Sequence, residues 1–247
     1  MSISKFIFIA SLAVTTLLGG ARAESIKPVV VELFTSQGCY SCPAAEKFLG
    51  QLKRARGDAV IALEFHVDYW NDLVWGSAGN WEDVHSKPEY TERQRRYSAV
   101  RLQGRRGVYT PQMVIGGRYA AVGSSARTVE NYIDQLQREP APLTVRIVFQ
   151  ENSLQVEIDG QVQEGAAVWL ANYDLKHTTE VTGGENHGKT LDNYNVVTDL
   201  RKIGTWQNGR VQLTVPGVVL DDNQGCAVFV QEERLGQILG AEKCPSG

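Results

Sequence analysis

The chain has 247 residues and a formal net charge of -3, with 25 lysines and arginines against 28 aspartates and glutamates. This mild acidity argues against nucleic acid as a partner, because nucleic-acid binding needs a basic surface. The length allows one large domain or two modest ones. Beyond residue 23 the sequence has no long hydrophobic segment or repeat, which predicts no stable membrane insertion of the mature chain.

The first 23 residues have the pattern of a cleaved signal peptide. Lys5 gives a short positive region, and residues 6–18 are apolar but too few to span a bilayer. Residues 21–23, Ala-Arg-Ala, fit the small-x-small cleavage rule. An uncleaved membrane anchor is the alternative. Cleavage would place residues 24–247 in the periplasm or outside the cell, where disulfides persist.

Residues 29–52 predict a buried strand, a turn and a helix. Residues 29–34 are mainly apolar and β-branched, which is typical of a strand buried on both faces. After a turn at residues 35–38, Cys39 and Cys42 form a C-x-x-C motif, and the apolar residues that follow recur at helical spacing. The motif therefore lies between a buried strand and a helix N-terminus. No second C-x-x-C or H-x-x-H follows to complete a zinc site.

This position gives the two cysteines different roles. A helix N-terminus has backbone N–H groups without intrahelical partners and a positive dipole, and both would stabilise a thiolate at Cys39. Cys42 lies one turn further on, close enough to form a disulfide with Cys39. Thiol–disulfide exchange needs an attacking thiolate and a second thiol that resolves the mixed disulfide. We therefore expect Cys39 to attack and Cys42 to resolve.

The rest of the first half alternates strands and helices, which predicts an α/β domain over residues 24–140. Its further elements are strands at residues 58–65, 113–115 and 119–122, and helices at about 88–104 and from residue 124 or 125 to 136. Residues 74–107 form a helical insertion rich in arginine. That insertion either covers the site and recognises an acidic partner, or is the solvated face that charge runs usually form. Residues 139–142, Glu-Pro-Ala-Pro, are typical of a stiff linker.

From residue 143 the period of the apolar pattern changes to two. Residues 143–149 and 154–158 alternate on either side of a turn, which predicts a hairpin. Further strand candidates are residues 166–173, 194–200, 211–215, 227–231 and 237–241. About seven short strands with turns between them predict an immunoglobulin-like β-sandwich over residues 143–247.

Cys226 and Cys244 flank a predicted hairpin with its turn near residues 232–234. That turn would put Cys226 opposite Ala241 or Glu242, with Cys244 within reach if the tail curls back. We predict a structural disulfide, which in the loop-closure model adds about 3 kcal/mol. A second redox pair is the alternative, although neither cysteine lies at a helix N-terminus.

Two motifs of the first half resemble the thioredoxin fold. The strand, C-x-x-C and helix match its opening, and residues 109–117, YTPQMVIGG, resemble the loop and strand that carry its cis-proline. The resemblance implies that Pro111 is cis and faces the C-x-x-C motif. With residues 34–39, FTSQGC, and 66–71, HVDYWN, the chain is similar to the exported thioredoxin-like family named domain of unknown function 1223. That family supplies an expected fold and no established activity.

The resemblance also implies residue roles. Thioredoxins have a buried acid about seven residues before the C-x-x-C motif, and Glu32 in that position would accept the proton of Cys42. A Glu32 that points away into a salt bridge is the alternative. An extended substrate would contact Thr110, Pro111 and Tyr40. Tyr40-Ser41 replaces the thioredoxin Gly-Pro, so oxidant, reductant and isomerase all remain open.

His66 and Asp68 follow the second predicted strand, at the same sheet edge as Cys39. A histidine near two thiolates suggests a soft metal site such as one for Cu(I). The alternative is a polar strand end that hydrogen-bonds its own loop, and we predict neither a metal ion nor a cofactor. The other histidines, at positions 85, 177 and 187, have no ligand spacing.

The leading hypothesis is an exported thiol–disulfide oxidoreductase that acts on protein thiols or disulfides through Cys39 and Cys42, with a redox partner. One alternative is a binding or adaptor protein in which the same disulfide is structural. The other is a copper-handling protein that binds Cu(I) through the two cysteines. The reduction potential of the pair separates the first two hypotheses.

Overall fold

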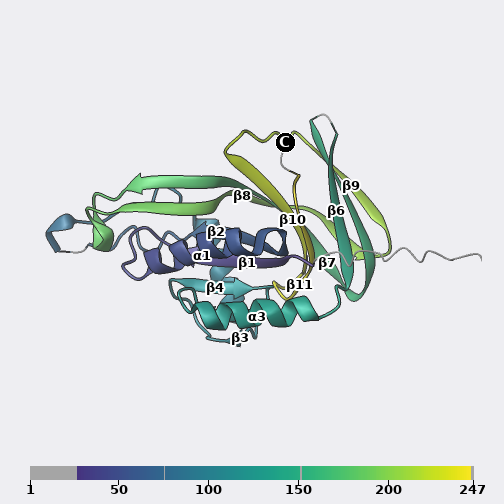
Figure 1. Ribbon diagram of the computed structural model, residues 1–247, viewed down its shortest axis with the longest axis horizontal. Helices are drawn as coiled ribbons and strands as arrows, with labels where there is room; N and C mark the ends of the chain where they lie inside the picture. Colours follow the sequence, from purple (N-terminus) through teal and green to yellow (C-terminus); the bar gives the residue numbers. More distant parts are fainter. Residues whose placement is uncertain (1–26, 75, 151, 246–247) are drawn as a thin grey trace, which may run out of the picture.

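A computed structural model describes residues 27–245 except residues 75 and 151 (Figure 1). The predicted signal peptide lies outside these described residues. The chain forms a mixed α/β structure with a large sheet of many strands and few helices. None of the helices in the described part of the chain is long and apolar enough to cross a membrane.

The first half is a strand–helix–strand unit followed by an insertion, two strands and a helix. Its principal elements are β1 (Val29–Thr35), α1 (Cys42–Arg56), β2 (Val60–His66), β4 (Gln112–Ile115), β5 (Tyr119–Val122) and α3 (Ala126–Arg138). The strand order is β2-β1-β4-β5, with β1 parallel to β2 and antiparallel to β4. Every residue of β1 and β2 is buried, as their apolar composition predicts for central strands.

Short elements connect these parts. They are η1 (Gly57–Ala59) before β2, and then η2 (Gly76–Ala78), α2 (Pro88–Ala99) and β3 (Gln103–Gly104) within the predicted insertion. The helix α2 ends at Ala99 rather than near Gly104. Val100 is already extended, and the chain then pairs with β5 as β3, which forms the edge of the sheet. Pairing with the sheet edge therefore overrides the helical pattern there.

The two faces of β1 are covered by different helices. Val31 and Leu33 pack in one apolar cluster with residues of α1 and α3. Val30 and Phe34 point the other way and pack in a cluster that includes Tyr97 of α2. Because successive side chains of a strand alternate between its faces, the even-numbered residues of β1 face away from α1.

The second half is all β. Its elements are β6 (Leu143–Gln150), β7 (Ser153–Glu180), η3 (Gly184–Asn186), β8 (Thr190–Asn208), β9 (Val211–Pro216), β10 (Gln224–Glu232) and β11 (Ile238–Lys243). Two of the predicted short strands, residues 154–158 and 166–173, are parts of the single 28-residue strand β7. This strand changes partners along its length, from β6 and β9 at its start to β8 and β10 further on.

One sheet joins the two halves. β8 pairs with β2 where Val196 lies beside Glu64, which gives the order β11-β10-β7-β8-β2-β1-β4-β5-β3. One core cluster also mixes the halves, because Phe34 and Phe65 pack in it with Tyr173 and Phe229. The linker at residues 139–142 therefore separates α3 from β6 without separating the cores.

Candidate functional site

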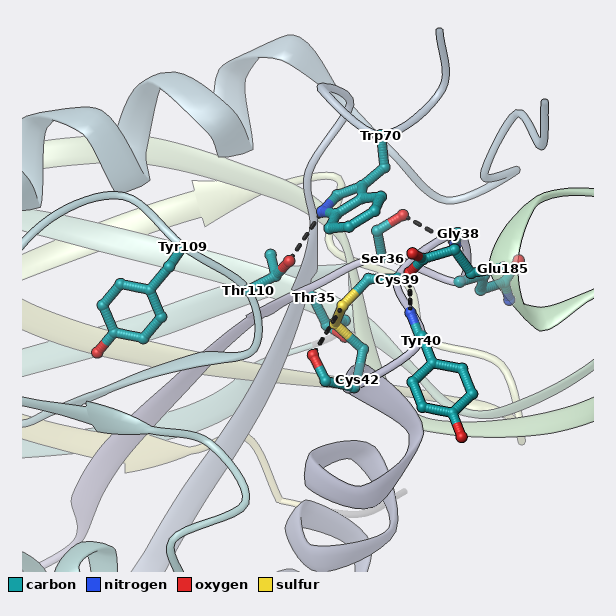
Figure 2. Close-up of a disulfide and its surroundings, with 12 residues drawn as sticks. Thr35, Ser36, Gly38, Cys39, Tyr40, Cys42, Trp70, Tyr109, Thr110 and Glu185 are labelled. Atoms are coloured by element: carbon teal, nitrogen blue, oxygen red, sulfur yellow. Dashed lines mark hydrogen bonds between the residues drawn. A yellow bond between two sulfur atoms is a disulfide. The ribbon is translucent and has the colours of Figure 1, made fainter. Parts of the chain in front are cut away.

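The C-x-x-C motif forms a tight turn between β1 and α1. The backbone N–H of Cys39 donates to the carbonyl of Ser36 at 3.1 Å, and α1 begins at Cys42. Cys39 and Cys42 form a disulfide (Figure 2). Their side chains are only 1% and 0% exposed. The sulfur atoms are therefore shielded from solvent in this conformation.

Trp70 connects the two segments that flank the disulfide. Its Nε1 donates to Oγ1 of Thr110 at 2.8 Å, and its Cβ lies next to Gly38, where an added Cβ would be 3.5 Å away (Figure 2). The Thr110–Pro111 peptide bond is cis, as the family resemblance implies. Trp70 thus connects the segment that contains Thr110 and Pro111 with the C-x-x-C loop.

The end of the β7–β8 hairpin packs on the C-x-x-C loop from the second half of the chain (Figure 1). Oε2 of Glu185 accepts a 2.7 Å hydrogen bond from the backbone N–H of Tyr40. Nδ2 of Asn186 donates to the carbonyls of Gln37 and Cys39, at 2.8 and 2.9 Å. Glu185 therefore uses one of the N–H groups near the helix start and adds a negative charge beside Cys39. No local sequence pattern relates residues this far apart.

Glu32 does not reach the disulfide. Its buried side chain lies on the face of β1 away from α1, which carries Cys42. Oε1 of Glu32 lies 2.6 Å from Nε of Arg93, and its Oε2 accepts a hydrogen bond from Tyr97. Arg93 also donates to Gln231 of β10, at 3.0 Å. The predicted proton-acceptor role of Glu32 is thus corrected to a buried ion pair, because the pleat of β1 turns this side chain away.

The acid on the same side as the disulfide is Glu46. It follows Cys42 by four residues in α1, so the two side chains share one helix face, one turn apart. Both are buried, and Oγ1 of Thr35 donates to Oε1 of Glu46 at 2.7 Å. A glutamate between Ala45 and Leu49, on an apolar helix face, is the sequence signal that could have identified it.

Three further ionisable side chains join Glu46 beneath the motif. Nδ1 of His66 lies 2.7 Å from Oδ2 of Asp83, and its Nε2 lies 3.2 Å from Oε1 of Glu64. All three are buried, and Asn193 donates to Glu64 at 2.6 Å. We call Glu46, Glu64, His66 and Asp83 the buried polar cluster. It surrounds one histidine with carboxylates in a region that water does not reach.

The surroundings shift the pKa values of this cluster. Burial, and then the negative charge of Glu64, raise the pKa of Glu46 to about 8. Burial opposes protonation of His66, yet the Asp83 and Glu64 carboxylates raise its pKa well above the usual value. Burial likewise opposes ionisation of Asp83, but its pKa is lowered by His66 and by hydrogen bonds. The surroundings therefore favour the protonated form of Glu46 and the ionised forms of His66 and Asp83.

His66 and Asp68 do not form one site. Asp68 accepts a 2.5 Å hydrogen bond from Thr91 of α2, whereas His66 points into the buried polar cluster. Two histidines without ligand spacing follow His66 in a chain of ring contacts, His85 next to His66 and His177 next to His85. The ring centroids of His66 and His85 are 5.3 Å apart, and those of His85 and His177 are 4.5 Å apart. Across the described residues, no three metal-binding side chains are grouped so as to hold an ion.

Tyr40 is the exposed residue of the motif. Its side chain is 69% exposed, and Nζ of Lys189 lies 4.5 Å from the centre of its ring. Figure 2 shows the ring pointing away from Thr110. Tyr40 and Thr110 therefore lie on different sides of the disulfide.

The second disulfide lies far from this site. Cys226 and Cys244 are bonded between β10 and the end of β11. Ala227 pairs with Lys243, so Cys244 lies directly opposite Cys226 rather than two or three residues beyond its partner. The register differs from the prediction because the loop between the strands runs from residue 233 to 237, beyond the expected turn, and a bulge follows Val230.

Fold and site together define an α/β protein with a C-x-x-C disulfide between a central strand and a helix N-terminus. The chain belongs to the family described as protein of unknown function (DUF1223), whose model matches residues 30–231. This confirms the predicted family. No curated protein matches the chain.

A solved structure extends this relationship. The chain is similar to a protein of Agrobacterium tumefaciens, determined by X-ray crystallography as a structural genomics target. The two are 30% identical, and the match covers 89% of this chain and 94% of the other, with a TM-score of 0.74. The relationship supports the overall fold, and the chemistry has to be argued from the residues.

Proposed function

We propose that this protein is a thiol–disulfide oxidoreductase that acts on protein thiols or disulfides through Cys39 and Cys42. The observation that carries this proposal is the position of the disulfide. It lies at the start of α1, bordered by the segment that contains Thr110 and Pro111. A disulfide with a purely structural role has no need of a helix N-terminus or of a neighbouring extended segment.

The arrangement of the first half supports a thioredoxin-like fold for residues 24–140. Its parallel β1–α1–β2 unit and antiparallel β4–β5–α3 unit have the order and directions that such a domain needs. For residues 143–247, a β-sandwich is supported by the apolar cluster between the β6–β7–β9 and β7–β10–β11 layers. We propose both assignments, with the two units joined through β2 and β8.

Each of the side chains Cys39, Cys42 and Glu46 has its own step in the proposed exchange reaction. A substrate thiolate attacks the sulfur of Cys39, a substrate–Cys39 disulfide forms, and the Cys39–Cys42 bond breaks with its electron pair on Cys42. Cys42 is buried, so its proton comes from the neighbouring acid Glu46, whose pKa is raised to about 8. In the opposite direction Glu46 takes the proton back and Cys42 attacks the mixed disulfide. No cofactor is needed, because the electrons pass between sulfur atoms.

Trapping the mixed disulfide tests the proposal. Cys42→Ala removes the resolving thiol, and we expect it to accumulate partner proteins bound through Cys39 that are released by reduction. The Cys39→Ala, Cys42→Ala double variant is the matched control and should trap none. Exported proteins are the expected partners, because stable disulfides belong to an oxidising compartment. A Cys42→Ala protein that collects no partner would leave the oxidoreductase proposal without its main support.

One observation favours a second candidate, a binding or adaptor protein with a structural disulfide. The sulfur atoms are buried, and the loop around them packs against Trp70 and is hydrogen-bonded to Glu185 and Asn186. The reduction potential decides between the two. A structural disulfide resists reduction to below about -300 mV, whereas a catalytic pair has a higher potential. No observation favours the copper-handling alternative, because His66 is paired with Asp83.

A further inference from the structure

The stretch beside the candidate site is strongly basic. Between Arg93 and Thr110 the sequence has six arginines and no aspartate or glutamate, although the chain as a whole has a net charge of -3. Arg93 is buried against Glu32. The other five are exposed at positions 95, 96, 101, 105 and 106. None of the ion pairs in the described part of the chain uses any of these five.

The strand β3 divides these arginines between the two ends of the sheet. Arg101 precedes β3, near Arg118, whose carbonyl accepts from the backbone N–H of Gln103. Arg105 and Arg106 follow β3, which runs parallel to β5 and therefore leads towards the start of β4. At that end of the sheet, Gln112 of β4 pairs with Phe34 of β1, just before the C-x-x-C loop. Arg105 and Arg106 are thus on the edge that carries the disulfide.

Side-chain hydrogen bonds connect the loop after Arg106 to α2. The Tyr69 hydroxyl donates to Gln94 at 3.2 Å, and Gln94 in turn donates to the carbonyl of Tyr109 at 2.7 Å. We call Arg105 and Arg106 the arginine rim. It borders the Thr110 side of the disulfide.

Arg105 is held in an orientation suited to binding carboxylates. Its guanidinium carbon lies 4.6 Å from the centre of the ring of Tyr109, which is four residues further along the loop. Stacking on an aromatic ring occupies the face of a guanidinium and leaves the N–H groups on its edge available. Those N–H groups match the two oxygens of a carboxylate.

The carboxylates near the disulfide do not neutralise this rim. Figure 2 shows Glu185 on the side of the disulfide opposite Tyr109 and Thr110, where it is bonded to Tyr40. Asp68 is held by the hydroxyl of Thr91. The Thr110 side, along which an extended substrate would run, therefore presents arginines that form no ion pair with the carboxylates in the described part of the chain.

We propose that the arginine rim binds acidic side chains of the protein substrate, so that this site prefers thiols and disulfides in acidic segments. The inference rests on the proposed oxidoreductase function and adds the substrate class. The rim brings complementary charge to the substrate before exchange begins, which raises the association rate and makes it sensitive to salt. A nucleic acid does not suit the site, because the reacting groups are sulfur atoms.

Two peptides test the preference. Both contain the same internal disulfide, flanked by glutamates in one peptide and by glutamines in the other, and each is mixed with the reduced protein. At low salt we expect the second-order rate constant to be about tenfold higher for the glutamate peptide, and this advantage to disappear at high salt. Equal rate constants for the two peptides would overturn the inference and leave the proposed function intact.

Variants locate the effect on the rim. Arg105→Gln with Arg106→Gln should abolish the preference for the glutamate peptide, whereas Arg101→Gln, an exposed arginine at the other end of β3, should keep it. An uncharged small disulfide should react equally with all three proteins, which shows that the sulfur chemistry is intact. Failure of the wild-type protein to react with any disulfide would instead contradict the proposed function.

Anionic phospholipid is the competing ligand. Vesicles of phosphatidylglycerol would bind the wild-type protein and not the double variant if the rim were a membrane contact. Such binding, combined with equal rate constants for the two peptides, would overturn the proposal. A loss of preference in Arg101→Gln as large as in the rim variant would also overturn it. The preference would then depend on the net charge of the protein and not on the position of the arginines.

Discussion

Cys42 is fully buried in the disulfide form, so the thiol that reduction releases would be out of contact with water. A thiol in that position depends on a neighbouring group that can give and take a proton. Glu46 is suited to this task, since its pKa of about 8 leaves it protonated but readily ionised near neutral pH. Glu32, in contrast, is committed to Arg93 on the other face of β1.

We predict that Glu46→Gln slows exchange by about 100-fold near neutral pH and removes the inflection near pH 8 from the rate profile. The amide keeps the shape of the side chain and a hydrogen bond with Thr35, so the fold is preserved. Stopped-flow measurement of exchange with a small disulfide between pH 5 and 9 gives the profile. Glu32→Gln is the control and should leave its shape unchanged. The same inflection in Glu46→Gln would exclude Glu46 from proton transfer.

The same carboxyl makes stability depend on pH. Its pKa is 4.5 in the unfolded chain and about 8 in the folded protein, so folding favours the protonated form. This contribution is fully present below pH 4.5 and is lost as the pH rises to 8. We therefore predict that Glu46→Gln loses less stability than the wild type between pH 5 and pH 8, by a few kcal/mol at most. Urea unfolding of both proteins at the two pH values checks this, and parallel losses would contradict it.

At the scale of elements, the β7–β8 hairpin completes the C-x-x-C loop. Asn186 near its end donates to two carbonyls of that loop, those of Gln37 and Cys39. These bonds hold the loop closed over the sulfur atoms. Their removal leaves buried acceptors with fewer donors, which costs free energy.

We predict that Asn186→Ala lowers the free energy of unfolding by about 1–3 kcal/mol and speeds reduction of the Cys39–Cys42 disulfide by a small dithiol. Asn223→Ala is the matched control, because Asn223 also donates to a backbone carbonyl but is exposed and lies outside the site. Thermal unfolding and the rate of thiol release measure the two effects. A destabilised Asn186→Ala protein with an unchanged reduction rate would mean that the hairpin does not shield the site.

Local elements could largely be predicted from the sequence, because their signals lie within a few residues. The buried strand β1, the motif and α1 follow from apolar spacing, and the hairpin of β6 and β7 follows from alternation. The face of β1 that Glu32 occupies could not be predicted, since a strand with every residue buried has no alternation to read. Glu185, Asn186 and His177 could not be assigned to the site, because they reach it only through the pairing of two long strands.

On the scale of the whole molecule, a buried network of hydrogen-bonded side chains links the two halves. Glu32 of β1, Arg93 and Tyr97 of α2, and Gln231 of β10 are connected by hydrogen bonds. The shared sheet and the shared apolar cluster add to this link. Unfolding of either half would therefore expose core residues of the other half to solvent.

We predict a single unfolding transition for both halves, and a loss of about 3–5 kcal/mol for Arg93→Met, which leaves Glu32 buried without its ionic partner. Combining it with Glu32→Gln should recover much of that loss. Urea unfolding followed by tryptophan fluorescence and by far-UV circular dichroism gives both results. Two separate transitions in the wild-type protein would contradict the shared core, and an unaltered midpoint in Arg93→Met would contradict the role of the ion pair.

The docking of residues 184–186 on the C-x-x-C loop has a consequence for biosynthesis. A nascent chain emerges with its N-terminus first, so Cys39 and Cys42 become available long before Glu185 and Asn186 are made. During that interval the two sulfur atoms lack the contacts that later shield them, and Cys226 and Cys244 do not yet compete for pairing. The order of the cysteines along the chain therefore lets each pair be oxidised in turn, and the site closes only after residues 184–186 have emerged and docked.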